Sequence, residues 1–132
     1  MKTLRIQTRH REQFIDITSD VNRFLKEKKI DEGLCIVFCP HTTAALTINE
    51  NADLSVKEDI VRRLGKIVPE NGSYLHSEGN SDAHIKSSML GSSLNIIVQA
   101  AKLVLGTWQG VYFCEFDGPR SREVYVKLIG SK

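Results

Sequence analysis

The sequence predicts a single α+β domain over residues 1–132, with antiparallel or mixed β-sheet and about three helices. Its length of 132 residues suits one domain that buries its own core, and 41% of its residues are hydrophobic and 26% charged. Helical and strand periodicities alternate irregularly, and the last third of the chain is dominated by strand patterns. Because we find no internal repeat, low-complexity tract or linker, we expect one domain.

The first third of the chain predicts a hairpin, a helix and a strand. Apolar and polar residues alternate over 4–8 and again over 14–17, which is typical of a β-hairpin. Residues 18–28 begin with capping oxygens and continue with apolar residues at helical spacing, and Gly33 follows as a stop signal. The run 34–39 is apolar on both faces, which predicts a central strand covered on each side.

The middle of the chain predicts a strand, a helix and a long loop. The segment 44–48 suits a strand, and polar residues at 49–53 offer caps for a helix over 54–64 that Gly65 can end. The stretch 69–82 is too polar and too rich in turn residues for a regular element. Long loops in compact domains are more often functional or disordered than incidental.

The C-terminal part predicts one more helix and four strands. Residues 83–90 form a helical pattern that Asp82 can cap and Gly91 can stop. The strand patterns that follow cover residues 94–98, 103–105, 111–116 and 124–129.

Three of the four histidines, His41, His76 and His84, adjoin breaks in regular structure. Imidazole is a common metal ligand, and three histidines around a zinc-like ion with one open position form a known catalytic arrangement. Their spacing does not force them together. From spacing alone, they are better explained as ordinary surface or hydrogen-bonding histidines.

Polar residues at the ends of the strand over 44–48 are candidate ligand contacts. Thr42 and Thr43 offer hydroxyl donors to a phosphate or carboxylate, but β-branched residues are also ordinary strand material. Asn49 and Glu50 precede a helix, where a cap and a favourable macrodipole interaction explain them equally well.

The single tryptophan, Trp108, lies with Gln109 between Gly106 and Gly110. Trp108 is placed to stack on an aromatic ligand while Gln109 reads its hydrogen-bonding edge. An anchor in the core, with the glycines marking strand ends, fits the pattern equally well.

The last candidates are a carboxylate and two arginines. Glu115 shares a strand face with apolar residues, so it must be paired, protonated or exposed, and it is a candidate base or metal-supporting group. A solvated face on an edge strand is the alternative. Arg120 and Arg122 lie in a turn and form the best anion clamp in the chain, although arginines in turns are often simply solvated.

Composition excludes several classes of protein. A net charge of +2 is too small for a dedicated nucleic-acid binder. No run approaches the ~18 apolar residues that cross a bilayer, and the first residues lack the apolar segment of a signal peptide. The three cysteines, Cys35, Cys39 and Cys114, cannot all pair within one chain, and we expect them to be reduced core residues. We therefore expect a cytoplasmic protein without nucleic-acid or membrane partners.

Taken in order, eight short motifs resemble the YjbQ-like family over most of the chain. They are HTTA at 41–44, NENAD at 49–53, VPEN at 68–71, YLH at 74–76, DAH at 82–84, LGSS at 90–93, LGTWQG at 105–110 and RSR at 120–122. The resemblance implies a small α+β domain that assembles as a homotrimer. It implies that His41, His76 and His84 bind a divalent metal, zinc or magnesium. It also marks further candidate site residues, which are Asn49, Glu50, Asp82, Trp108, Gln109, Glu115, Arg120 and Arg122.

The family is described as secondary thiamine-phosphate synthases, so the resemblance implies an enzyme that couples hydroxymethylpyrimidine diphosphate to thiazole phosphate and releases pyrophosphate. In that reaction the metal and the arginines stabilise the leaving group, and Trp108 stacks on a ring. Two alternatives stay open: a metal-dependent hydrolase of a small phosphorylated metabolite, and a trimeric small-molecule binding module without turnover. One departure from the family pattern is Ala100-Ala101, which replaces an Asn-Gly turn and disfavours a tight hairpin there.

Overall fold

A computed structural model describes residues 1–131, which form three helices and two antiparallel sheets. Sheet A has the strand order β1-β8-β3-β5-β6, with β1 Lys2–Gln7, β8 Ser121–Ser131, β3 Glu32–Phe38, β5 Ser93–Gln99 and β6 Lys102–Leu103. Sheet B has the order β2-β7-β4, with β2 Gln13–Asp16, β7 Gln109–Glu115 and β4 Ala44–Glu50. The predicted α+β class with three helices is confirmed.

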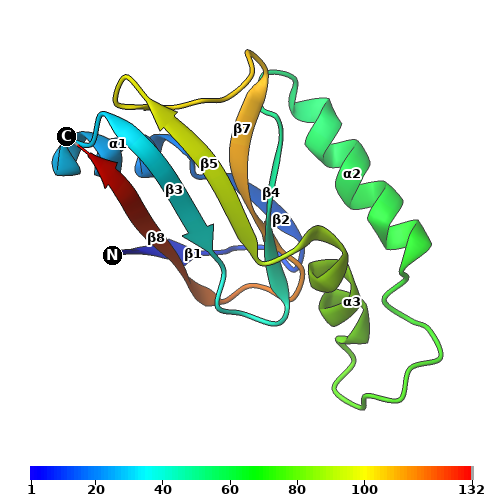
Figure 1. Cartoon of the computed structure of the whole chain (residues 1–132). Coiled ribbons are helices and arrows are strands. Elements are labelled where there is room, and N and C mark those ends of the chain that lie inside the picture. Colours follow the sequence, from blue (N-terminus) through cyan, green and yellow to red (C-terminus); the bar gives the residue numbers. More distant parts are fainter. Residues whose placement is uncertain (132) are drawn as a thin grey trace.

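The two sheets and two of the helices form three layers (Figure 1). Inner residues of both sheets, such as Val37 and Phe113, form one core cluster, and α1 (Thr18–Lys28) adds its apolar face to it. The outer face of sheet B packs against α2 (Leu54–Ile67) and α3 (Ser81–Leu90) in a second cluster. Within residues 1–131, every helix is too short or too polar to cross a membrane.

The predicted N-terminal hairpin is wrong. The two strands exist, but β1 pairs with β8 in sheet A and β2 pairs with β7 in sheet B. The polar segment between them carries the chain from one sheet to the other, and it is held there by hydrogen bonds from Thr8 N to Arg120 O (3.0 Å) and from Gly118 N to Arg11 O (2.9 Å). Alternation therefore identified the strands without identifying their partners.

The strand β3 is central in sheet A, but only one of its faces is covered in the single chain. Cys35 and Val37 are fully buried against sheet B, while Phe38 on the opposite face is 41% exposed. The strand enclosed on both sides is β7, which lies between sheet A and the helical layer and buries every residue after Gln109. The fully apolar run therefore predicted a central strand correctly. It predicted wrongly that both faces of this strand are covered within one chain.

Each of the three helices departs from its predicted signals at one end. Asp53 caps α2 as expected, accepting a hydrogen bond from Ser55 N at 3.0 Å, but the helix continues past Gly65. The end of α1 is Lys29 in the left-handed conformation (φ 53°). Asp82 does not cap α3, because it lies inside the first turn and its carboxylate pairs with the side chains of Arg11 and Lys86.

The turn Ala100-Ala101 is tight despite its sequence. Val98 pairs with Leu103 and Gln99 with Lys102, so two residues connect β5 to β6, and both have positive φ (51° and 59°). This is the backbone of a type I′ turn, which favours Asn-Gly. The sequence disfavours a tight hairpin here, yet the hairpin is tight, and the two alanines hold a conformation that is unfavourable for residues with a Cβ atom.

The double substitution Ala100→Asn with Ala101→Gly is expected to stabilise the protein by about 1 kcal/mol, because it removes the unfavourable left-handed alanines. Urea unfolding of both proteins measures this difference in the free energy of unfolding. Ala52→Gly, at an exposed position without positive φ, serves as the control and should be neutral or destabilising. An unchanged or lower midpoint for the double variant would contradict the expectation.

Candidate functional site

Seven of the predicted site residues meet at one end of sheet B. The β3–β4 connection brings His41, Thr42 and Thr43, the α2–α3 loop brings His76, α3 brings His84, and the β7–β8 turn region brings the two arginines. Together they line a cavity of about 470 Å³, here called the histidine pocket, whose complete lining is Pro40, His41, Thr42, Thr43, His76, Glu78, Asn80, His84, Asp117, Arg120 and Arg122.

Two of the three imidazoles are neighbours. The ring centroids of His76 and His84 are 5.4 Å apart and the rings meet edge to face. His84 is half-buried on a helix, whereas the side chain of His76 is 45% exposed on the loop and lies 3.7 Å from the Glu78 carboxylate. The position of His84 is therefore better fixed by the surrounding structure than that of His76.

The third imidazole, His41, is fixed by the backbone of β8. Its Nε2 lies 2.9 Å from the backbone nitrogen of Glu123 and 3.1 Å from the Glu123 carbonyl oxygen, so either neutral tautomer has a partner. Burial, followed by the nearby Arg122 charge, lowers the pKa of His41 below 6.5. The ring is therefore neutral at physiological pH, the form that binds a metal or accepts a proton.

The histidines line one pocket without forming a closed coordination shell. Among residues 1–131, no three histidine, cysteine, aspartate or glutamate side chains are close enough together to hold a metal ion. Nitrogen donors nevertheless converge, since His41 and His84 line the cavity from supported segments and His76 approaches from the loop. Imidazole nitrogens are donors that a divalent ion such as zinc accepts, so the residue types in this pocket fit such an ion.

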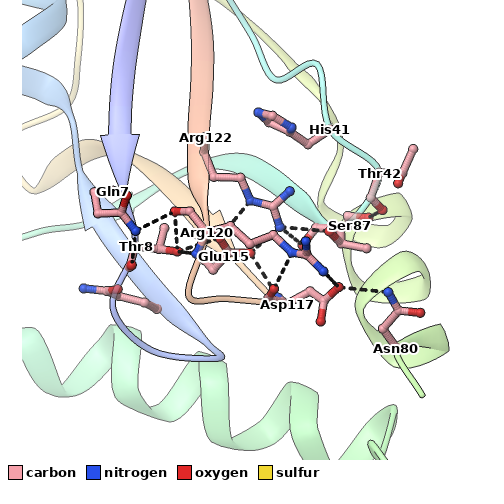
Figure 2. A network of polar contacts seen from close by, with 12 residues as sticks. Gln7, Thr8, His41, Thr42, Asn80, Ser87, Glu115, Asp117, Arg120 and Arg122 are labelled. Carbon is pink, nitrogen blue, oxygen red and sulfur yellow. Dashed lines mark hydrogen bonds and ion pairs between the residues drawn. The ribbon is translucent and has the colours of Figure 1, made fainter. Parts of the chain in front are cut away.

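A buried ion pair between Arg122 and Glu115 lies behind the pocket lining, to which Arg122 contributes (Figure 2). Arg122 donates from Nε to Glu115 Oε1 (2.8 Å) and from Nη2 to Glu115 Oε2 and to Thr43 Oγ1, the last at 2.8 Å. Glu115, which is fully buried, also accepts hydrogen bonds from Thr8 Oγ1 at 2.8 Å and from the backbone of Asp117 at 3.0 Å. The solvated edge-strand alternative for Glu115 is excluded, because β7 is the middle strand of sheet B.

Opposing effects set the protonation of Glu115. Burial alone raises its pKa, but the hydrogen bonds from Arg122, the Asp117 backbone and Thr8, together with the Arg122 charge, bring the pKa below 4.5. The carboxylate is therefore ionised at neutral pH and fully engaged, so its contribution is to hold Arg122 in place.

The two arginines are held differently. Arg122 is almost completely buried, yet its Nη1 makes no hydrogen bond within residues 1–131, which leaves these N–H groups for a ligand in the pocket. Arg120 is about half exposed and is bound through Nε to the Asp117 carbonyl (2.8 Å) and through Nη2 to its carboxylate (3.0 Å). Arg122 is thus fixed by buried contacts, whereas Arg120 is held only by contacts at a half-exposed position.

Asp82 anchors the helical layer rather than lining the pocket. Its buried carboxylate binds both terminal nitrogens of Arg11 (3.2 and 3.0 Å) and the Nζ of buried Lys86 (3.0 Å). Burial raises the pKa of Asp82, but these two cations lower it below 3.8 overall. Arg11 also reaches Glu70 at 3.4 Å, so it ties the start of the α2–α3 loop to α3.

Four predicted site residues lie at the opposite end of sheet B. Glu50 pairs with Gln109, whereas Ala44 pairs with Glu115, six residues away along β4 and about 20 Å distant. Asn49, Glu50, Trp108 and Gln109 therefore do not line the histidine pocket of their own chain.

Local contacts occupy three of these distant side chains. Asn49 Oδ1 accepts from Glu50 N (2.7 Å), Glu50 Oε2 accepts from Asp53 N (3.2 Å), and Gln109 Oε1 accepts from Gly106 N (2.7 Å). Trp108 is 62% exposed, which excludes the core-anchor alternative.

Sequence reasoning missed several residues that support the site. Asn80 is buried at the start of α3 and donates to Asp117 Oδ2 at 2.8 Å, and Arg11 and Lys86 hold Asp82. Lys86 has a local signal, since it follows Asp82 by one helical turn. Arg11 had no such signal, because its partner is 71 residues away.

A family model described as "UPF0047 protein YjbQ-like" matches residues 2–131. The chain belongs to this family. It is 53% identical over 131 residues to UPF0047 protein YugU of Bacillus subtilis, covering 98% of this chain and 99% of that protein. It is 54% identical over 127 residues to UPF0047 protein MJ1081 of Methanocaldococcus jannaschii, covering 96% and 92%.

Solved structures of the family share this fold closely. An uncharacterised YjbQ/UPF0047 protein from Clostridium acetobutylicum superposes with a TM-score of 0.96 at 53% identity, covering 98% of this chain and all (100%) of that one. A YbjQ-like protein of unknown function from Sulfolobus solfataricus gives a TM-score of 0.95 at 31% identity, covering 98% and 96%. The predicted family and fold are confirmed, and the names of these relatives assign no reaction.

The buried ion pair generates a pH-dependent prediction. Glu115→Gln should destabilise the protein by about 3 kcal/mol at neutral pH, because Arg122 loses its buried counter-charge. The depressed pKa of Glu115 gives stability that is fully present above its ordinary value of 4.5 and is lost as pH falls through the lower folded-state value. Denaturant unfolding at several pH values should therefore show that the difference in the free energy of unfolding between wild type and Glu115→Gln decreases as the pH falls from neutral to acid.

The control for this measurement is Glu123→Gln, which removes the exposed partner of Arg5 (3.1 Å). Exposed pairs contribute only about 0–1 kcal/mol, so this variant should stay close to wild type at every pH. An equal effect of the two substitutions, or a constant gap for Glu115→Gln down to acid pH, would show that Glu115 is not the stabilising charge.

Proposed function

We propose that this protein is an enzyme that binds a small phosphorylated metabolite in the histidine pocket and displaces its phosphate or diphosphate group. The observation that carries the proposal is Arg122, whose guanidinium is fixed by Glu115 and Thr43, keeps Nη1 free of hydrogen bonds within residues 1–131, and lines a cavity together with three histidines. A preorganised guanidinium stabilises charge on a departing phosphate with little reorganisation. Arg120 and the exposed hydroxyl of Thr42 offer further donors to the same anion.

The proposal includes a divalent metal held by His41, His76 and His84. Imidazole donors favour zinc over magnesium, which prefers oxygen ligands. When bound, such an ion supplies Lewis-acid stabilisation to the phosphate oxygens. The backbone of Glu123 orients His41 for this role, as second-shell groups commonly do for metal-binding histidines.

The reaction that we propose first is the thiamine-phosphate synthase coupling, in which pyrophosphate leaves hydroxymethylpyrimidine diphosphate as the thiazole nitrogen attacks. Arg122, Arg120 and Thr42 then bind the leaving group. Placement of the rings by Trp108 and Gln109 requires a second copy of the chain, because both lie at the far end of sheet B in their own chain.

A specific observation favours a second candidate, hydrolysis of a small phosphate ester. The histidine pocket of one chain contains anion donors and imidazoles, but among the described residues no phenylalanine, tyrosine or tryptophan lines it. The pocket therefore has groups that can bind a phosphate and activate a water molecule, but no aromatic side chain on which a substrate ring could stack. His41, which is neutral at physiological pH, lines this cavity and is the candidate acceptor for the proton of that water.

The experiment that tests the proposal is a product assay on zinc-loaded and magnesium-loaded protein. Thiamine phosphate and pyrophosphate are the expected products from the two coupling substrates, and inorganic phosphate is the expected product from a panel of phosphate esters if hydrolysis is the reaction. His84→Ala should lose bound metal and at least about 100-fold in turnover, because it removes a supported ligand. Metal content is measured by elemental analysis.

His10→Ala serves as the matched control, since His10 is exposed and does not line the histidine pocket. Full metal content in His41→Ala, His76→Ala and His84→Ala would refute the metal site. Saturable binding of phosphate esters without product under any metal condition would identify a binding module instead of an enzyme.

We also propose that the protein assembles as a homotrimer through the outer face of sheet A. The register of β3, β5 and β8 places Leu34 beside Ile97 and Ile129 on this face. Ile97 is 62% exposed and Ile129 54% exposed in the single chain, and Phe38, which stacks on Tyr125, lies on the same face four residues further along β3. Large apolar side chains exposed together on one sheet face are typical of a surface covered by another subunit.

Ile97→Lys should shift the protein from trimer to monomer, because it places a charge in the centre of this apolar face. Size-exclusion chromatography with light scattering measures the mass. Met89→Lys is the matched control, since Met89 is similarly exposed (54%) but lies on α3. A wild-type monomer at micromolar concentration, or a trimer unaffected by Ile97→Lys, would contradict the proposed interface.

We further propose a cytoplasmic location and small metabolites as ligands. Cys35, Cys39 and Cys114 are all buried and unpaired, as predicted, which supports a reducing compartment. Burial raises the pKa of Cys35 to about 11, so its thiol stays protonated and unreactive. The small net charge of +2 gives no basis for a nucleic-acid partner.

A further inference from the structure

A second cavity adjoins the histidine pocket and is not used by the proposed function. It has a volume of about 390 Å³ and lies between the β3–β4 connection, the second half of α3 and the start of β5. His41, Thr42 and His84 line both cavities. We call it the serine pocket, after the lining residues Ser87, Ser88 and Ser92.

The two cavities differ in charge. The histidine pocket includes Arg120 and Arg122 together with Glu78 and Asp117. No lysine, arginine, aspartate or glutamate of the described residues lines the serine pocket. Because desolvating a charge without a counter-charge is unfavourable, the serine pocket suits an uncharged part of a ligand.

The hydrogen bonds that the pocket serines make within the protein determine which ligand groups the serine pocket can bind. Ser87 donates its hydroxyl proton to a backbone carbonyl, with Thr42 O at 2.6 Å and His84 O at 3.1 Å, and Ser88 donates to His84 O at 2.9 Å. A hydroxyl has one proton and two lone pairs, so both serines are left with acceptor capacity. The wall therefore favours ligand groups that donate hydrogen bonds, such as hydroxyl or amino groups.

We infer that the substrate has two chemically distinct parts: an anionic phosphate at Arg122 and a neutral part with hydroxyl or amino groups in the serine pocket. Ser87 and Ser88 are then specificity-determining residues. His41 and His84, which line both cavities, lie beside the bond that joins the two parts. This inference rests on the proposed function, because it takes the phosphate site at Arg122 as its starting point.

The test compares two ligands with the same carbon chain and the same phosphate, glycerol 3-phosphate and propyl phosphate, by titration calorimetry with the full chain. Wild type should bind glycerol 3-phosphate about tenfold more tightly, because two hydroxyl donors find acceptors. Ser88→Ala should reduce this advantage to about threefold and leave the affinity for propyl phosphate unchanged. Ser88 is exposed, so the substitution does not threaten the fold.

Two further variants complete the design. Ser88→Thr keeps the hydroxyl and should retain the preference, and Ser73→Ala, at an exposed serine outside both cavities, should behave as wild type. Equal wild-type affinities for the two esters, or an equal loss for both in Ser88→Ala, would overturn the inference and leave the phosphate site standing. Failure of both esters to bind would overturn the proposed function together with the inference.

Discussion

The ion pair between Arg122 and Glu115 is the interaction on which the pocket end of the molecule depends. Two opposite charges lie where water barely reaches, and such a pair is favourable only when its remaining hydrogen-bonding capacity is satisfied. Thr8, Thr43 and the backbone of Asp117 satisfy it. These partners come from the segments next to β1, β4 and β7, so one charged cluster ties both sheets together at this end.

A second charged network does the same for the helical layer. Asp82 holds Arg11 and Lys86, and Arg11 extends the contact to Glu70 at the start of the loop that carries His76. The first network reaches the histidine pocket through Arg122, Thr43 and Asp117, whereas Asp82, Arg11 and Lys86 do not line it. Both networks fix the segments that carry His41, His84 and Arg122. A site that stabilises a charged transition state usually needs its groups held in place before the ligand binds.

Local patterns predicted the elements well and their partners poorly. Periodicity identified the strands and all three helices, because each pattern depends on which residues of one segment face the core. Pairing depends on segments far apart in the chain, so the alternating N-terminal strands were assigned to one hairpin although they belong to different sheets. The Ala100-Ala101 turn formed against its local preference because the sheet register on both sides determines it.

The candidate site shows the same limit. Strand-end positions pointed to His41, Thr42 and Thr43, and the turn after β7 pointed to Arg120 and Arg122, and all five line one cavity. The motif around Trp108 is equally polar and equally close to a strand end, yet it lies at the other end of sheet B. Which end a strand terminus occupies follows from strand direction within the sheet, and no short motif encodes that direction.

The contact between His41 and the backbone of Glu123 couples two groups of the pocket mechanically. Glu123 directly follows Arg122 in β8, so a single peptide segment sets the position of the imidazole and of the guanidinium. A displacement of this segment moves both groups in the same direction and preserves their separation. A ligand that pulls on either group therefore transmits the displacement to the other through the backbone of β8.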